Sequence, residues 1–116
     1  MPKRRLDPLP SAAFQILLAL VEEDLHGYGI MRQVKEQTGG SMRLGPGTLY
    51  SSIQGLLEEG LIAEVGAKQD AEPSDGRRRT YRLSKAGHEL ACAEAERLAG
   101  VLRVARARRV LRGDYV

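Results

Sequence analysis

Residues 44–60 read LGPGTLYSSIQGLLEEG, and this run decides the fold expected for the chain. Pro46 suits the first position of a helix, where its missing N–H costs nothing, and Gly60 suits the left-handed residue just beyond the end. Apolar residues recur at i, i+4, i+7 and i+8, which places them on one stripe. They are Leu49, Ile53, Leu56 and Leu57. The run therefore predicts a short helix that buries one face and presents the other to a partner.

The presented face of this helix is small, polar and uncharged until Glu58 and Glu59. It is expected to carry Gly47, Thr48, Ser51, Gln54 and Gly55. Side chains of this kind can approach base edges and phosphates without clashing, and the positive end of the helix dipole points the same way. An ordinary half-buried surface helix would show the same pattern. The rest of the chain therefore decides whether this face contacts DNA.

The composition suits one globular domain, since the chain has 116 residues of which 42% are hydrophobic. Its formal net charge of +3 permits binding to nucleic acid without demanding it. Cys92 is the only cysteine, which excludes an intramolecular disulfide and a thiolate zinc cluster, so a reducing, cytoplasmic setting is expected. The longest apolar stretch, residues 12–21, is too short to span a bilayer, and no signal peptide is expected. No association with a membrane is predicted.

Two helices are expected before the presented one. The first begins at Ser11, a good N-cap, and runs to about Glu23. It is apolar almost all round, so it needs cover on more than one side, and a second subunit would supply the second cover. The next helix covers residues 28–38, with Tyr28, Met31 and Val34 facing inward, and ends at two glycines. A short connection to the presented helix then gives a helix-turn-helix.

Basic residues accompany this helix-turn-helix. Lys35 lies off the apolar stripe of its helix and Arg43 points outward from the connection, so each could meet a phosphate or form part of a solvated surface. Arg5 belongs to a basic arm over residues 1–10, which is expected to be flexible until something anionic meets it.

A hairpin is predicted after Gly60. Residues 61–67 and 80–83 have the composition of strands, and the polar run between them has Pro-Ser-Asp-Gly at its tip. Arg77, Arg78 and Arg79 follow this turn, and alternation along a strand sends at least one of them to solvent. A guanidinium there can enter a minor groove or hold a phosphate, as in the wing of a winged helix. A solubilising loop is the alternative.

A long last helix is expected from its cap at Ser84 to Arg109 or further. Its narrow apolar stripe has near-heptad spacing, and little of the chain remains to cover it, which indicates a dimerisation arm. The residues predicted for dimerisation, two of them in the first helix, are Phe14, Leu17, Leu90, Leu98, Val101, Leu102 and Ala105.

The fold class predicted from these elements is mainly α with a small β-hairpin, a winged helix-turn-helix plus a long C-terminal dimerisation helix. The expected divisions are a basic arm (1–10), the winged helix-turn-helix DNA-binding domain (11–83), the dimerisation helix (84–112) and a tail (113–116).

Three stretches, in this order, resemble the PadR family of bacterial transcriptional regulators: residues 25–30 (LHGYGI), residues 45–62 and residues 79–87 (RTYRLSKAG). The resemblance implies a homodimeric repressor that binds a palindromic operator and releases it when a small molecule binds. It places Thr48, Tyr50 and Ser51 on the recognition helix. The family commonly has a basic residue near the position of Gln54, so here more of the phosphate contact is expected from the wing and the N-terminal arm.

The DNA-binding residues predicted in all are Arg5, Lys35, Arg43, Thr48, Tyr50, Ser51, Gln54, Arg77, Arg78 and Arg79. The chain shows no catalytic constellation: His26 and His88 lie far apart without ligand-spaced partners, so neither an enzyme nor a metal site is expected. Cys92 is expected to be a small buried residue rather than a redox sensor. No cofactor is predicted, and a small-molecule effector is left open. The alternative function is a winged-helix module that binds an acidic protein partner.

Overall fold

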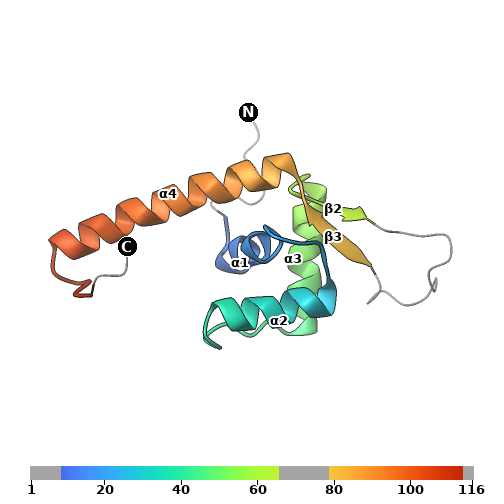
Figure 1. Cartoon of the computed structure of the whole chain (residues 1–116), viewed down its shortest axis with the longest axis horizontal. Helices are drawn as coiled ribbons and strands as arrows, with labels where there is room; N and C mark the ends of the chain where they lie inside the picture. Colours follow the sequence, from blue (N-terminus) through green and yellow to red (C-terminus); the bar gives the residue numbers. More distant parts are fainter. Residues whose placement is uncertain (1–8, 66–78, 114–116) are drawn as a thin grey trace.

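The computed structural model describes residues 9–65 and 79–113. The elements follow the order α1 (Ser11–Ala19), β1 (Leu25–His26), α2 (Gly27–Gln37), α3 (Pro46–Glu58), β2 (Ile62–Val65), β3 (Thr80–Leu83) and α4 (Lys85–Ala107). Figure 1 shows α1, α2 and α3 gathered beside one half of α4, while the other half of α4 continues past them. The predicted fold class, mainly helical with a small sheet and a long last helix, is confirmed. Among the described residues, no helix combines the length and apolarity needed to cross a bilayer.

Helix α3 forms as its sequence predicts. Gly45 is the N-cap, Pro46 stands at the first helical position, and Gly60 takes the left-handed conformation just past the end, with φ of 73°. Leu49, Ile53 and Leu56 are buried in the core. Gly55, which was expected on the presented face, is buried instead, because a residue without a side chain is easily shielded by its neighbours on the helix.

The predicted extent of the first helix is wrong at its end, since α1 stops at Ala19 rather than near Glu23. The chain has to leave the helix there because it next forms β1, which was not predicted. Leu25 of β1 pairs with Tyr81 of β3, far along the sequence. Asp24, just before β1, also accepts hydrogen bonds from Arg82 Nε and Nη2, the shortest at 2.9 Å. Contacts distant in the sequence therefore set this boundary.

The sheet has three antiparallel strands in the order β1-β3-β2. In the pair of β2 and β3, Ile62 lies opposite Leu83 and Val65 lies opposite Thr80, as expected for the two arms of a hairpin. The tip of the predicted wing, with Arg77 and Arg78, lies outside the described residues. Arg5 of the predicted arm lies outside them too.

Helix α2 begins at Gly27 and is capped by His26, whose Nδ1 accepts a hydrogen bond of 2.9 Å from the Gly29 N–H. Ile30 and Val34 fill the core, whereas Tyr28 is 55% exposed. The prediction that Tyr28 faces inward is wrong, because it lies two residues, about 200° of helical rotation, away from Ile30. The phase of α2 therefore turns Tyr28 to solvent.

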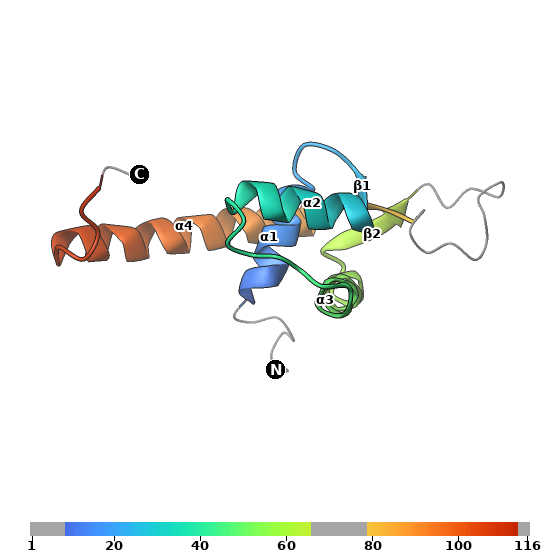
Figure 2. The same cartoon turned by 90° about the horizontal axis from the view of Figure 1, so that it is seen from below.

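Helix α4 is held at its first turn by hydrogen bonds, and its second half extends beyond the other helices. The Ser84 hydroxyl accepts a hydrogen bond from the Gly87 N–H and donates one of 2.7 Å to the Gly60 carbonyl, which ties α4 to the end of α3. The helix ends at Ala107, slightly before the predicted Arg109, and Arg109 takes a left-handed conformation with φ of 65°. Figure 2 shows the same extension of α4 beyond the other helices from a second side.

One predicted dimerisation residue is contradicted by its burial. Leu17 has no exposed surface and belongs to the core of the single chain, so it cannot contact a second subunit. Leu17, Leu18 and Val21 were expected on one apolar face of the first helix, but they differ in burial. Leu17 lies in the core, while Leu18 and Val21 are 37% and 46% exposed. Phe14 and Leu90 are partly buried against the core.

Candidate nucleic-acid interface

The presented face of α3 is open in the structure. Gly47, Thr48, Ser51 and Gln54 are all exposed, and Tyr50 keeps 39% of its surface exposed. No side chain caps the start of the helix, whose N-cap is a glycine. The first N–H groups of α3 are therefore offered outward together with small polar side chains. Figure 2 looks nearly along α3 and shows α1 and α2 to one side of it.

Gln54 is the longest polar side chain on this face. Its Nε2 donates a hydrogen bond of 3.2 Å to Glu58 Oε2, one helical turn further on. This bond lays the amide along the helix axis and leaves its carbonyl oxygen able to accept. An amide in this position can exchange the carboxylate for a base edge, where glutamine pairs best with adenine.

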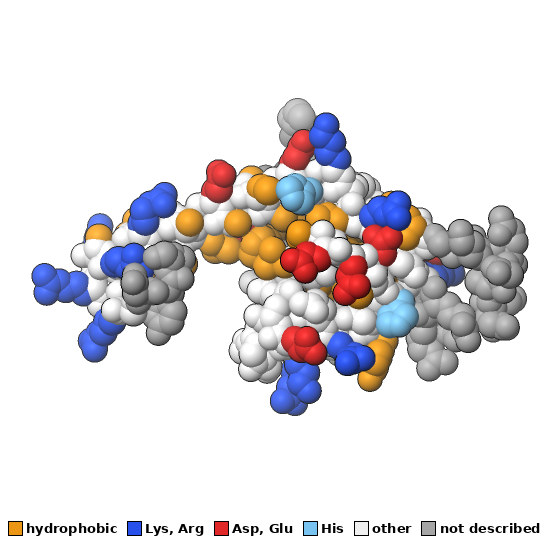
Figure 3. All heavy atoms as spheres, viewed as in Figure 1, with side chains coloured by type: hydrophobic (Ala, Val, Ile, Leu, Met, Phe, Trp, Pro, Cys, Tyr) orange, Lys and Arg blue, Asp and Glu red, His pale blue; other side chains and the backbone are white. Residues whose placement is uncertain are grey.

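Lys35 and Arg43 are brought together although they belong to different segments. Both line an open hollow between α2 and the connection to α3, together with Tyr28 and Arg32. Figure 3 shows basic side chains gathered over α2 at the lower edge of the molecule. Tyr28 was not among the predicted site residues, because it was expected to face inward. Its position one helical turn before Arg32, on the exposed side of α2, is the pattern that could have revealed it.

Arg79 directly precedes β3, the second wing strand, and is exposed. Its Nε is 3.8 Å from Glu64 Oε2 on the neighbouring strand, a loose and solvated ion pair. Arg82 further along β3 is instead held by Asp24, with 2.9 Å between Arg82 Nη2 and Asp24 Oδ2. Of these two arginines, Arg79 is the one that a phosphate could recruit at little cost.

Tyr81 separates these two arginines and is buried beneath the sheet, with 3% of its surface exposed. Burial raises the pKa of its phenol above the ordinary value of 10.0, and the negative charge of Glu64 raises it further. The side chain belongs to the hydrophobic core and lies in β3, two residues after Arg79.

The structure also bears on the residues considered for other chemistry. Across residues 9–65 and 79–113, no group of three or more His, Cys, Asp or Glu side chains could hold a metal ion. The expectation that Cys92 is buried is wrong, because it lies on an exposed side of α4. Its Sγ is 3.8 Å from His88 Nδ1, one turn earlier in the same helix.

Comparison with known proteins identifies the family of this chain. Residues 16–92 match the transcriptional regulator PadR-like family. An uncharacterized 37.1 kDa protein in transposon TN4556 of Streptomyces fradiae is 38% identical over 90 residues. That alignment covers 76% of this chain and 23% of the relative, so the chain spans about a quarter of the length of the curated protein it matches.

Solved structures share the fold. A PadR family transcription regulator from Clostridium difficile superposes with a TM-score of 0.70 at 24% identity, covering 84% of this chain and 97% of that one. Bacillus subtilis PadR in complex with operator DNA superposes with a TM-score of 0.61 at 21% identity, covering 74% of this chain and 48% of that one. Since the family match spans well over half of the sequence, from α1 into α4, the chain belongs to the PadR-like family of transcriptional regulators.

Proposed function

We propose that this protein is a homodimeric repressor that binds a palindromic DNA operator in the cytoplasm and responds to a small-molecule effector. The observation that carries the proposal is the open face of α3, where Thr48, Ser51 and Gln54 stand exposed beside the uncapped start of the helix. Apart from the exposed ring of Tyr50, the side chains of this face are small, and none is negatively charged over the first two turns, so the face can enter a major groove. The related Bacillus subtilis protein was solved with operator DNA, which supports the same use here.

Positioning and reading of the DNA fall to different residues in this proposal. Arg79, Lys35 and Arg43 hold phosphates, and the first N–H groups of α3 add a favourable end of the helix dipole. Ser51 and Gln54 contact base edges. Substitution of the first group should weaken binding to every duplex alike, whereas substitution of the second should change which duplex is preferred.

The homodimer is proposed to use the apolar residues that the chain leaves uncovered. Val101 is 51% exposed and Val104 is 55% exposed, in the half of α4 that extends past the other helices (Figure 1). Leu18 of α1 and Val21, two residues past the end of that helix, are also exposed, at 37% and 46%. A two-fold dimer built on α4 and α1 would bury them and present two α3 helices, with half-sites about one helical turn of DNA apart or a multiple of it.

The test is selection of bound sequences from a random duplex pool, followed by titration of a selected duplex and a scrambled one at several stated salt concentrations. We expect a palindromic consensus. Ser51→Ala and Gln54→Ala should shrink the affinity ratio between the two duplexes, while Ser11→Ala, at the exposed start of α1, should leave it unchanged. No enrichment over the starting pool would overturn the proposal and favour the alternative, a module that grips an acidic protein.

A further inference from the structure

Exposed side chains of α2 form one stripe along the side of the helix that faces solvent. Tyr28, Arg32 and Lys35 are spaced at i, i+4 and i+7, which places them on the same face. Tyr28 is 55% exposed, and both cations are exposed too. Glu36 borders the stripe and is also exposed. The stripe therefore offers an aromatic ring next to two positive charges, with one carboxylate beside them.

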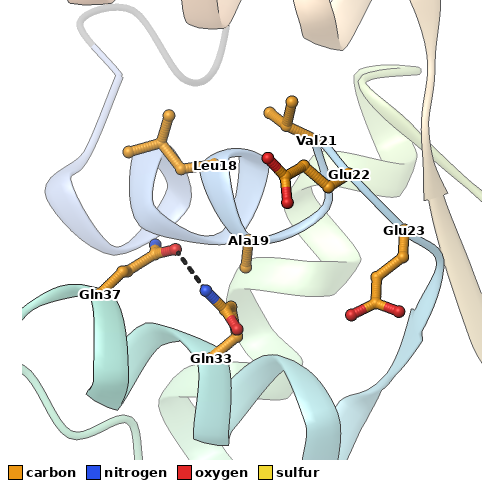
Figure 4. A pocket seen from close by; sticks show the side chains of 7 residues that line it. All are labelled: Leu18, Ala19, Val21, Glu22, Glu23, Gln33 and Gln37. Carbon is orange, nitrogen blue, oxygen red and sulfur yellow. Dashed lines mark hydrogen bonds between the residues drawn. The ribbon is translucent and has the colours of Figure 1, made fainter.

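The opposite side of α2 packs toward α1, which fixes the direction of this stripe. Gln37 Nε2 donates hydrogen bonds of 2.8 Å to the carbonyl oxygen and to Oε1 of Gln15 in α1. Figure 4 shows Gln33 and Gln37 pointing toward α1, in a hollow that Glu22 and Glu23 also line. That hollow is acidic, so it does not suit an anion. The stripe lies on the other face of α2.

The connection after α2 brings a third cation to the stripe and is held in a fixed shape. Residues 39–40 are glycines in the left-handed conformation, with φ of 62° and 85°, and they turn the chain. Thr38 Oγ1 accepts a hydrogen bond of 3.1 Å from the Met42 N–H, and Ser41 Oγ donates one of 2.9 Å to the Thr38 carbonyl. Arg43 follows directly. Its backbone is therefore in place before any ligand arrives, which lowers the cost of ordering it on binding.

An open hollow lies between the stripe and this connection, and its volume of about 560 Å³ falls in the range of small-molecule sites. We call it the basic hollow. The side chains that line it are Tyr28, Arg32, Lys35, Glu36 and Arg43. The two glycines of the connection complete the lining, and a Cβ added to either would meet no other atom within 4 Å. This part of the rim is therefore open to a ligand.

The charge of the basic hollow favours an anion. Three cations face one carboxylate, and within residues 9–65 and 79–113 no ion pair engages Arg32, Lys35 or Arg43. Exposed cations of this kind can move onto a ligand without breaking a contact in the protein. Guanidinium and ammonium groups both bind phosphate strongly, the guanidinium often through two parallel hydrogen bonds. A ligand with several phosphate charges would therefore match the hollow.

The ring of Tyr28 indicates what else the ligand carries. A nucleic-acid base stacks well on an exposed aromatic side chain, and cations beside the ring then meet the phosphates of the same nucleotide. A DNA duplex does not make both contacts here, because its phosphates face outward while its bases stay stacked and paired inside. A free nucleotide offers the base and the phosphates together.

We propose that the basic hollow binds a free nucleoside polyphosphate, with the base on Tyr28 and the phosphates on Arg32, Lys35 and Arg43. Lys35 and Arg43 also hold DNA phosphates in the proposed function, so the nucleotide and the operator compete for the same cations. The inference rests on that proposed function in this step alone, and it names the class of the effector. Release of DNA then needs no change of fold, only occupation of the hollow.

The test is isothermal titration calorimetry of the full-length chain with ATP, inorganic pyrophosphate and adenosine, without DNA and without divalent cations. ATP should bind more tightly than pyrophosphate, because only ATP carries a base, and adenosine should bind most weakly. Tyr28→Ala should raise the dissociation constant of ATP about tenfold and leave that of pyrophosphate unchanged. Tyr28→Phe keeps the ring and should stay within about twofold of the wild type. Arg43→Ala should weaken the binding of both phosphate ligands.

Two further variants test whether the charge of the hollow itself is responsible. Glu36→Gln removes the carboxylate of the hollow and should tighten ATP binding, whereas Arg103→Ala, at an exposed cation of α4, should not change it. Circular dichroism establishes that each variant is folded. ATP affinity that responds equally to Arg43→Ala and Arg103→Ala would show a general attraction to positive charge and would overturn the site. ATP affinity that Tyr28→Ala leaves unchanged would overturn the recognition of the base.

The competition is measured by fluorescence anisotropy on the selected duplex at fixed ionic strength. ATP at ten times its dissociation constant should raise the dissociation constant of the duplex about tenfold, and adenosine at the same concentration should not. ATP that binds but leaves DNA affinity unchanged would overturn the competition. A chain that binds the duplex but not ATP would overturn the nucleotide site and leave the proposed function intact. A chain that binds ATP but no duplex would overturn the proposed function and leave the nucleotide site standing.

Discussion

The ring of Tyr50 in α3 lies against Gly27, the first residue of α2. A Cβ placed on Gly27 would be 2.5 Å from the Tyr50 Oη and 3.0 Å from its Cζ, which is closer than atoms approach without moving. Only a residue without a side chain allows the tyrosine to take this position. Gly27 at the start of α2 therefore fixes the position of the Tyr50 ring on the presented face of α3.

Gly27→Ala should reduce affinity for operator DNA several-fold while changing the free energy of unfolding by less than about 1 kcal/mol. The ring that must move is the far end of a half-exposed side chain, so it can swing outward toward the DNA at little cost. Fluorescence anisotropy and urea denaturation measure the two quantities. In a Tyr50→Ala background the same substitution should no longer affect DNA affinity. An effect of equal size in both backgrounds would show that it does not act through the ring.

Gly87→Ala should destabilise the fold by about 2 kcal/mol or more. A Cβ at Gly87 would overlap the backbone carbonyl oxygen of Leu61 and would come within 2.8 Å of Leu83 Cδ1. A backbone atom between α3 and β2 cannot swing away, so α4 would have to shift at its anchored end. The measurement is the urea midpoint of unfolding.

Gly100→Ala is the matched control in the same helix. The nearest atom to a Cβ there is Arg103 Nη2 at 3.7 Å, an ordinary contact. Helix propensity should then dominate and stabilise the protein by about 0.5–1 kcal/mol. Equal losses at the two glycines would contradict the close approach to Leu61.

The parts of the fold that the sequence predicts are those whose signals are local. Helix α3 was predictable because its signals are local: Pro46 at the start, Gly60 at the end and a regular apolar stripe between them. The cap at Ser84 was predictable for the same reason. Strand β1 was not, because two residues carry no periodicity and form a strand only by pairing with β3.

The residues of the candidate site also fall into those that a local pattern predicts and those that it does not. Exposure of Thr48, Ser51 and Gln54 follows from helical phase within one element, and the structure confirms it. Three other features depend on contacts between elements, which no local pattern encodes. Lys35 and Arg43 line the same hollow, Arg79 pairs with Glu64, and Leu17 is fully buried. Their roles in binding DNA remain predictions.

Glu64→Gln should strengthen binding to all duplexes, while Arg79→Ala should weaken it and reduce the slope of affinity against salt by about one. The reason is that the carboxylate of Glu64, 3.8 Å from the Arg79 guanidinium, competes with a phosphate for the same cation. Anisotropy titrations at several salt concentrations on specific and scrambled duplexes measure both effects. Adding Glu64→Gln to Arg79→Ala should restore nothing if the competition is for Arg79, so a full gain in that background would contradict it.

Stability should fall above about pH 10 because of Tyr81. Its pKa is raised above 10.0 in the folded chain, chiefly by burial and then by Glu64, so the folded state holds the phenolic proton more tightly than the unfolded state does. This contribution is fully present below the unfolded pKa and is lost as the pH rises through the folded one. Urea midpoints between pH 8 and 11 should decline less steeply in Tyr81→Phe, whereas Tyr28→Phe, at an exposed position, should follow the wild type. A wild-type slope that Tyr81→Phe leaves unchanged would show that the alkaline transition arises from another group and not from the buried phenol of β3.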